Sequence, residues 1–135
     1  MKKITLFLFV IVILMVSCGD KNAYTITGTV SGDEYVVKTV YLQALDTNFE
    51  DKVNIDSTSI EDGKFKFSGL STAPTINFLR FGDRGELPFI LEPGKIEISI
   101  EDKKEMPIVK GTPMNESFFA LISKVGGNDS NPLVY

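Results

Sequence analysis

Short runs in which apolar and polar residues alternate, separated by turn sequences, constrain this chain more than any other feature. Within residues 24–31, for example, Tyr24, Ile26 and Val30 alternate with three threonines, which is the period of a half-buried strand. We expect eight such strands, at residues 24–31, 38–46, 53–60, 65–68, 75–81, 87–91, 95–101 and 106–110. Strands of this length and spacing predict a mainly β domain, built as an antiparallel sandwich or a barrel-like sheet.

Two turn sequences punctuate these strands. Glu61-Asp62-Gly63-Lys64 stands between residues 53–60 and 65–68, and an Asp-Gly step between β-rich runs is the strongest local signal for a hairpin. In Glu92-Pro93-Gly94-Lys95, proline presets φ at one turn position and glycine accepts a positive φ at the next. We therefore predict a hairpin at the first site and a tight turn at the second.

The period changes near the end of the chain. Thr112 and Pro113 resemble a helix cap and a first helical position, and the apolar residues that follow recur at helical spacing. These residues are Met114, Phe118, Leu121, Ile122 and Val125. We expect one short helix over residues 113–125 with a single apolar face, followed by a disordered tail over residues 126–135.

The amino-terminal segment has the composition of a secretion signal. Lys2 and Lys3 precede an apolar run over residues 4–16, which ends at Ser17 and Cys18. A helix that crosses the hydrocarbon core needs ~20 apolar residues, so this run of thirteen is too short for a permanent span. We expect residues 1–17 to form a helical signal peptide, residues 18–23 a tether, and residues 24–112 the β domain.

The junction Ser17-Cys18-Gly19 resembles the lipobox of bacterial lipoproteins. In that family the peptide is cut between the residues that correspond to Ser17 and Cys18, and the cysteine carries a diacylglycerol and an acyl chain such as palmitate. The alternatives are a plain signal peptide that leaves a free thiol, or an uncleaved anchor. A lone exported cysteine has no disulfide partner, so lipid attachment at Cys18 and a membrane-bound protein are the expectation.

The amino-acid composition argues against several classes of function. The chain has no histidine and a single cysteine, so it lacks the usual general base and the commonest transition-metal ligand. Once Cys18 is acylated, no thiol remains for thiol-disulfide exchange. The formal net charge is −4, and the basic pair Lys103-Lys104 is flanked by Asp102 and Glu105. Nucleic acid, a metal ion, a bound cofactor and catalytic residues are therefore not expected.

The remaining polar patterns are better explained as turns. Asp46, Asn48 and Glu50 imitate the first positions of an EF-hand, but Asp51 stands where that loop requires glycine. Three pairs of neighbouring carboxylates border predicted turns, and neighbours on a strand point to opposite faces. These pairs are Glu50-Asp51, Glu61-Asp62 and Glu101-Asp102. We expect solvated turns at all of them.

Four segments, taken in order, are similar to a known β-rich domain. The segments are residues 24–30, 62–69, 89–94 and 110–115. The family is an uncharacterised domain found just after the lipidated cysteine of Gram-negative envelope lipoproteins, usually ahead of a thioredoxin-like or AhpC/TSA domain that reduces disulfides. The resemblance extends from Tyr24 to about Lys124. It implies a periplasm-facing protein held at the inner or outer membrane. The Cys-x-x-Cys pair of the relatives is absent from this sequence.

The resemblance implies a non-catalytic accessory or spacer domain, either free-standing or part of a longer oxidoreductase. The expected contact with a thioredoxin-like domain or another envelope protein is the helical face of Met114, Phe118, Leu121 and Ile122. The alternative is a free-standing module that binds glycan or peptide through exposed aromatic residues. The candidates for that role are Tyr35, Phe49 and Phe81.

Overall fold

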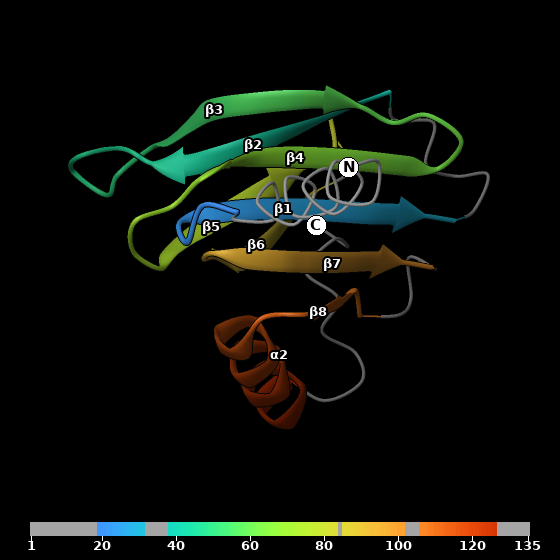
Figure 1. The fold of residues 1–135 in the computed structure, drawn as a ribbon. Helices are drawn as coiled ribbons and strands as arrows, with labels where there is room; N and C mark the ends of the chain where they lie inside the picture. The colour runs from blue at the N-terminus through green and yellow to red at the C-terminus, as the bar shows by residue number, and fades with distance from the viewer. Residues whose placement is uncertain (1–18, 32–37, 84, 102–105, 127–135) are drawn as a thin grey trace, which may run out of the picture.

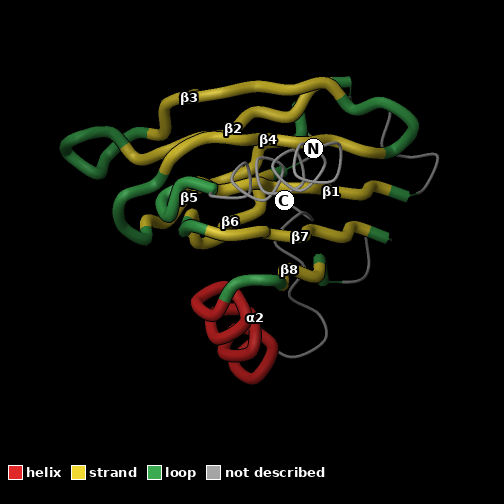
Figure 2. Tube along the Cα trace, in the orientation of Figure 1, coloured by secondary structure: helices red, strands yellow, loops and turns green. Residues whose placement is uncertain are grey.

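In the described part of the chain, two four-stranded sheets pack face to face, and one helix lies along an edge of this sandwich (Figures 1 and 2). The structure is a computed structural model that describes residues 19–31, 38–83, 85–101 and 106–126. The predicted signal peptide, Cys18, Tyr35 and residues 127–135 lie outside the described residues. The predicted sandwich with a carboxyl-terminal helix is confirmed, and the sheets do not close into a barrel.

The first sheet, sheet A, has the strand order β4-β1-β7-β8. Its strands are β1 (Ala23–Val30), β4 (Lys64–Leu70), β7 (Gly94–Ile100) and β8 (Ile108–Lys110). β1 pairs antiparallel with β4 but parallel with β7. The parallel pair departs from the expected all-antiparallel arrangement. It joins the first strand of the domain to the seventh, and parallel neighbours require such a long connection.

The second sheet, sheet B, is antiparallel throughout, with the order β3-β2-β5-β6. Its strands are β2 (Thr39–Leu45), β3 (Lys52–Ser59), β5 (Thr75–Arg80) and β6 (Glu86–Leu91). β3 is an edge strand whose residues are exposed, apart from the half-buried Thr58. In Figure 1, β3 lies at the opposite end of the molecule from β8 and the helix.

The predicted turn at Glu61–Lys64 is correct, but the two strands that it connects do not pair with each other as a hairpin would. Asp62 and Gly63 have φ values of 51° and 70°, as in a type I′ turn, and Glu61 and Lys64 exchange two backbone hydrogen bonds of 2.9 Å. Beyond this bridge, β3 pairs with β2 while β4 pairs with β1. The turn therefore carries the chain from sheet B to sheet A. The Pro93-Gly94 turn does the same between β6 and β7.

The inward side chains of both sheets form one core. Its aromatic centre is Phe65, whose ring contacts those of Phe67 and Phe81 edge to face at centroid distances of 6.3 and 5.8 Å. Phe81 is fully buried, so it is not the exposed aromatic residue that the ligand-binding alternative required. Of the three aromatic candidates, Phe49 alone is shown to be exposed, at 77%.

Glycines in the β1–β4 pair make room for aromatic rings. Gly28 lies opposite Phe65, and a Cβ atom on Gly28 would lie 2.0 Å from Cζ of that ring. The reverse arrangement also occurs, with the glycine on β4 and the ring on β1. Gly69 lies opposite Tyr24, and a Cβ atom on Gly69 would lie 2.5 Å from the phenol oxygen. Each ring covers the backbone of the opposing glycine, as in the aromatic rescue of strand glycines.

The helix α2 (Pro113–Gly126) follows β8 and packs against β6 and β8. Val109 of β8 and Phe119 of α2 belong to the core, which explains why so short a strand is ordered. β8 begins at Ile108, two residues later than predicted. Among the described helices, none has the length and apolar character needed to cross a membrane.

Candidate functional site

The first turn of α2 is fixed to the edge of sheet B by the Asn115 side chain. Its Oδ1 accepts a hydrogen bond from the backbone N–H of Ile90 at 2.8 Å, and its Nδ2 donates to the Ile90 carbonyl at 2.7 Å. Nδ2 also donates to Oγ1 of Thr112 at 2.9 Å. Asn115 is fully buried, and β6 is an edge strand. The amide therefore replaces a neighbouring strand at Ile90 and covers this part of the edge.

The helix cap comes from a distant part of the chain. Thr112 lies at the predicted cap position, but the backbone N–H groups of Met114 and Asn115 donate to Oε1 of Glu92, at 3.0 and 3.3 Å. Glu92 is 6% exposed and precedes the Pro93-Gly94 turn. Its carboxylate satisfies two N–H groups that have no acceptor within the helix, at the positive end of the helix dipole. Glu92 and Asn115 together set the position of α2.

Some apolar side chains of α2 are buried against the sandwich, and others are exposed to solvent. Phe119, which was not assigned to the predicted face, is 8% exposed, while Phe118 and Ile122 are half-buried. Met114 and Leu121 are 46% and 60% exposed. The predicted single apolar face is therefore only partly buried, because the helix is turned so that Asn115 and Phe119 face the core. Val125, at 80% exposure, continues the open side. We call Met114, Leu121 and Val125 the exposed stripe.

The outward positions of sheet A carry lysines and hydroxyls. The registers place Lys66, Thr27, Glu97 and Lys110 in one row across the four strands, and Lys64, Thr29, Ser99 and Ile108 in the next. A further row contains Ser68, Thr25 and Lys95. These positions hold four lysines and one carboxylate, whereas the whole chain has a net charge of −4. We call this surface the lysine face.

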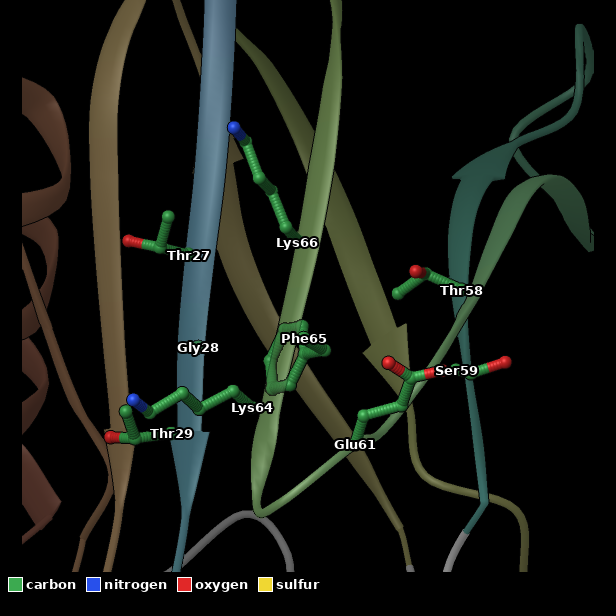
Figure 3. Close-up of a pocket in the computed structure, with 9 residues that line it drawn as sticks. All are labelled: Thr27, Gly28, Thr29, Thr58, Ser59, Glu61, Lys64, Phe65 and Lys66. Atoms are coloured by element: carbon green, nitrogen blue, oxygen red, sulfur yellow. The ribbon is translucent and has the colours of Figure 1, made fainter.

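A groove of about 580 Å³ runs along β4 at the border of the lysine face (Figure 3). β1 lines it with Thr27 and Thr29, and the end of β3 lines it with Thr58 and Ser59. In Figure 3 the Lys64 side chain extends across β1 towards Thr29, and Lys66 also extends towards β1. Among the described residues, neither lysine has a carboxylate within salt-bridge distance. The groove therefore presents two ammonium groups and several hydroxyls, together with the carboxylate of Glu61, which also lines it.

A second hollow, of about 400 Å³, lies on the other side of β1. It shares Thr27 and Thr29 with the groove and is also lined by Glu97, Ile108 and Lys110. Glu97 and Lys110 form an exposed ion pair at 3.7 Å, so this side of the face is partly neutralised. Glu101 also lines this hollow, so the positive charge of the face is greater on the side of Lys64 and Lys66.

Residues 46–51, whose sequence resembles the start of an EF-hand loop, form a turn around Asp46. Oδ1 of Asp46 accepts backbone N–H bonds from Asn48, Glu50 and Asp51, at 3.2, 2.9 and 3.3 Å. Phe49 takes a φ of 59° at its tip. Glu50-Asp51 and Glu61-Asp62 lie in exposed turns, as expected, and Asp102 lies outside the described residues. Within residues 19–31, 38–83, 85–101 and 106–126, no group of three metal-ligating side chains is found.

Tyr24 is a buried titratable residue near the start of β1. Burial raises the pKa of the Tyr24 phenol, and the nearby Asp56 carboxylate raises it further. The residue is 7% exposed and packs over Gly69. Neutral tyrosine is therefore the form that the fold accommodates.

The described part of the predicted tether, residues 19–23, is hydrogen-bonded to itself and to the β domain. The side chain of Asp20 accepts the backbone N–H of Asn22 at 2.9 Å, and its carbonyl accepts the N–H of Ala23 at 3.1 Å. The carbonyl of Asn22 accepts the N–H of Ser71 at 2.8 Å, which ties the segment to the end of β4. In the sequence, only Gly19, Asp20 and Lys21 separate Cys18 from this attachment.

Sequence reasoning did not single out Glu92, Asn115, Lys64 or Lys66. Glu92 and Asn115 lie in segments that carried the family resemblance, but their pairing depends on a contact over more than twenty residues. The alternating lysines in Lys64-Phe65-Lys66-Phe67 could have indicated a strand with one charged side, a signal that our reading of the sequence did not use. The neighbours across the sheet, which turn that side into a surface, come from pairing and are not visible in the local sequence.

Comparison with protein families agrees with the resemblance at the level of the domain. The family model of the domain of unknown function DUF4369 matches residues 24–118, which run from the start of β1 into the second turn of α2. No curated protein and no solved structure matches the chain. The match includes Glu92, Asn115 and the strands of both sheets. Because it covers well over half of the sequence, the chain belongs to the family of domains of unknown function DUF4369.

Proposed function

We propose that this protein is a non-catalytic, lipid-anchored domain of a Gram-negative cell envelope, which acts as a spacer and docking surface for a thioredoxin-like domain. The observation that supports docking is the exposed stripe of α2. Leu121 and Val125, at 60% and 80% exposure, are large apolar side chains left in water on an ordered element that is otherwise fixed by buried hydrogen bonds. The oxidoreductase association follows from the family resemblance.

Anchoring at Cys18 is supported by the signal-like segment and by the short tether. Residues 4–16 are apolar and end at Ser17-Cys18, and the chain is hydrogen-bonded to the end of β4 from Asn22 onward. Two or three acyl chains hold a protein on a bilayer stably, at ~0.8 kcal/mol per buried CH₂ group. The sandwich would therefore remain next to the membrane surface.

The anchor is tested by expressing the full chain in a Gram-negative host. Intact mass should show cleavage before Cys18 and the added mass of lipid, and the protein should enter the detergent phase on partition. The Cys18→Ser variant should show neither change. An unmodified amino-terminal thiol in the processed native chain contradicts the anchor.

The docking role is tested by placing a photoreactive residue on either side of α2. At position 121 it should cross-link to a thioredoxin-like domain in envelope preparations, whereas at the exposed position 116, on another side of the helix, it should not. Equal cross-linking from both positions, or products that contain no thioredoxin-like domain, would contradict the proposal. Reduction of a protein disulfide by the Cys18→Ser chain would contradict the non-catalytic role.

A further inference from the structure

We infer that the lysine face of sheet A lies against the anionic phosphates of the bilayer that holds the anchor. The inference rests on the lipid attachment proposed above and adds an orientation and a binding surface to it. Its geometric basis is the end of sheet A at which the chain arrives from Cys18. Ala23 and Leu70 pair at that end, immediately after the segment attached to Ser71.

The lysine face is apolar near the anchor and carries cations farther from it, which suits a membrane surface. Leu70, beside the anchor, is 67% exposed and points to the same side as Ser68, Lys66 and Lys64. Lys66 and Lys64 lie four and six residues before Leu70 on β4, roughly 13 and 20 Å from it at ~3.3 Å per residue. Leu70 would contact the acyl chains at the anchor, and the lysines beyond it would contact the lipid headgroups.

Charge separation within the molecule supports the same orientation. The face carries four lysines, Lys64, Lys66, Lys95 and Lys110, against the carboxylate of Glu97. Two further carboxylates, Glu61 and Glu101, line the hollows at its borders, so the lysines remain in excess. The chain as a whole is acidic, so an anionic bilayer would repel most other surfaces and attract this one. The threonine hydroxyls of β1 between the lysines donate hydrogen bonds to phosphate oxygens. The groove along β4 is the place where a headgroup phosphate would meet Lys64 and Lys66 together.

Lysine reactivity on the lipidated protein tests the orientation. The native, processed chain, verified by intact mass, is reconstituted into vesicles of phosphatidylcholine alone or with phosphatidylglycerol, and acetylation of each lysine is followed by peptide mass spectrometry. Acetylation of the four face lysines should be slower by roughly fivefold with phosphatidylglycerol, and the difference should disappear at about 0.5 M NaCl. Lys38 and Lys124, which are exposed and lie outside the face, should react equally in both vesicles.

A pair of charge-matched variants separates the face from net charge. Lys64→Gln/Lys66→Gln should remove the protection of Lys95 and Lys110, while Lys38→Gln/Lys124→Gln should leave it intact. Equal acetylation of all lysines on a lipidated chain overturns the orientation and leaves the anchor standing. Absence of lipid from the chain overturns both. Protection of Lys64 and Lys66 by inorganic phosphate on neutral vesicles, without any effect of phosphatidylglycerol, would also overturn the orientation, because the groove would then bind free phosphate.

Discussion

Asn115 is the residue on which the attachment of the helix most depends. Its side chain is fully buried, with two hydrogen bonds to Ile90 and one to Thr112. Replacement by leucine leaves the backbone N–H and C=O of Ile90 buried without partners, and we expect Asn115→Leu to reduce the free energy of unfolding by about 3 kcal/mol. Urea denaturation followed by circular dichroism measures this change. Ser117→Ala, at an exposed position of the same helix, should change it by less than about 0.5 kcal/mol. Equal midpoints for the two variants would show that the contact to β6 is unimportant.

Tyr24 should make the protein less stable at high pH. Because burial raises the pKa of its phenol in the folded state, the unfolded chain loses the proton first as the pH rises. The stabilisation by neutral Tyr24 is complete below the unfolded pKa of ~10 and is lost as the pH rises through the higher folded value. Tyr24→Phe should therefore flatten the decline of the unfolding free energy above about pH 10. Parallel urea titrations of the two proteins check this, and identical slopes would rule out a role for Tyr24.

At the level of single residues, the sequence indicates burial better than it indicates contacts. Ile96, Ile98 and Ile100 alternate and are all buried, as expected for one side of a strand. Thr112 occupies the predicted cap position, yet the acceptor for the helix N–H groups is Glu92, while Thr112 Oγ1 accepts a hydrogen bond from Asn115. Burial follows from local periodicity, whereas a hydrogen bond over more than twenty residues depends on how the sheets are stacked.

Among the elements, the pairing of β1 with β4 depends on the absence of a side chain at Gly28. An alanine Cβ would lie 2.0 Å from the Phe65 ring, so the ring must leave its place between Phe67 and Phe81. Gly28→Ala should cost about 1–3 kcal/mol of unfolding free energy, as for other overpacked positions. Phe65→Leu should remove most of that cost, so the double variant should be less destabilised than the sum of the two changes. Additive effects in the urea midpoints would contradict the contact.

The same elements show why strand positions were predictable and strand partners were not. All eight strands fall within two residues of their predicted limits, because alternation and turn residues act locally. The Asp62-Gly63 turn reverses the chain as predicted, but it does not determine that β4 continues in the other sheet. That choice follows from Phe65 and Phe67, whose rings are buried when β4 pairs with β1 and places them towards the core.

Across the whole molecule, the parallel contact between β1 and β7 brings the beginning of the domain beside its end. β8 extends sheet A beyond β7 and α2 packs beside it, and the lysine face runs from β4 across to β8. The exposed stripe of α2 belongs to the opposite end of the molecule from β3 (Figure 1). An anchored domain with these two surfaces would hold a partner at the side of α2 while sheet A lies on the bilayer.

This arrangement makes α2 part of the folding unit, and its removal should affect the entire sandwich. A chain that ends at Gly111 loses Phe119 from the core, the cap contacts of Glu92 and the cover over Ile90. We expect at least ~3 kcal/mol of destabilisation, since a buried aromatic side chain and a buried polar contact are lost together. The matched control is the full chain with Leu121→Ser and Val125→Ser, which alters the exposed stripe and keeps Phe119. Thermal unfolding should show a lower midpoint for the shortened chain and a nearly unchanged one for the control. If the shortened chain unfolds at the full-length temperature, α2 is an appendage and the stripe belongs to an independent element.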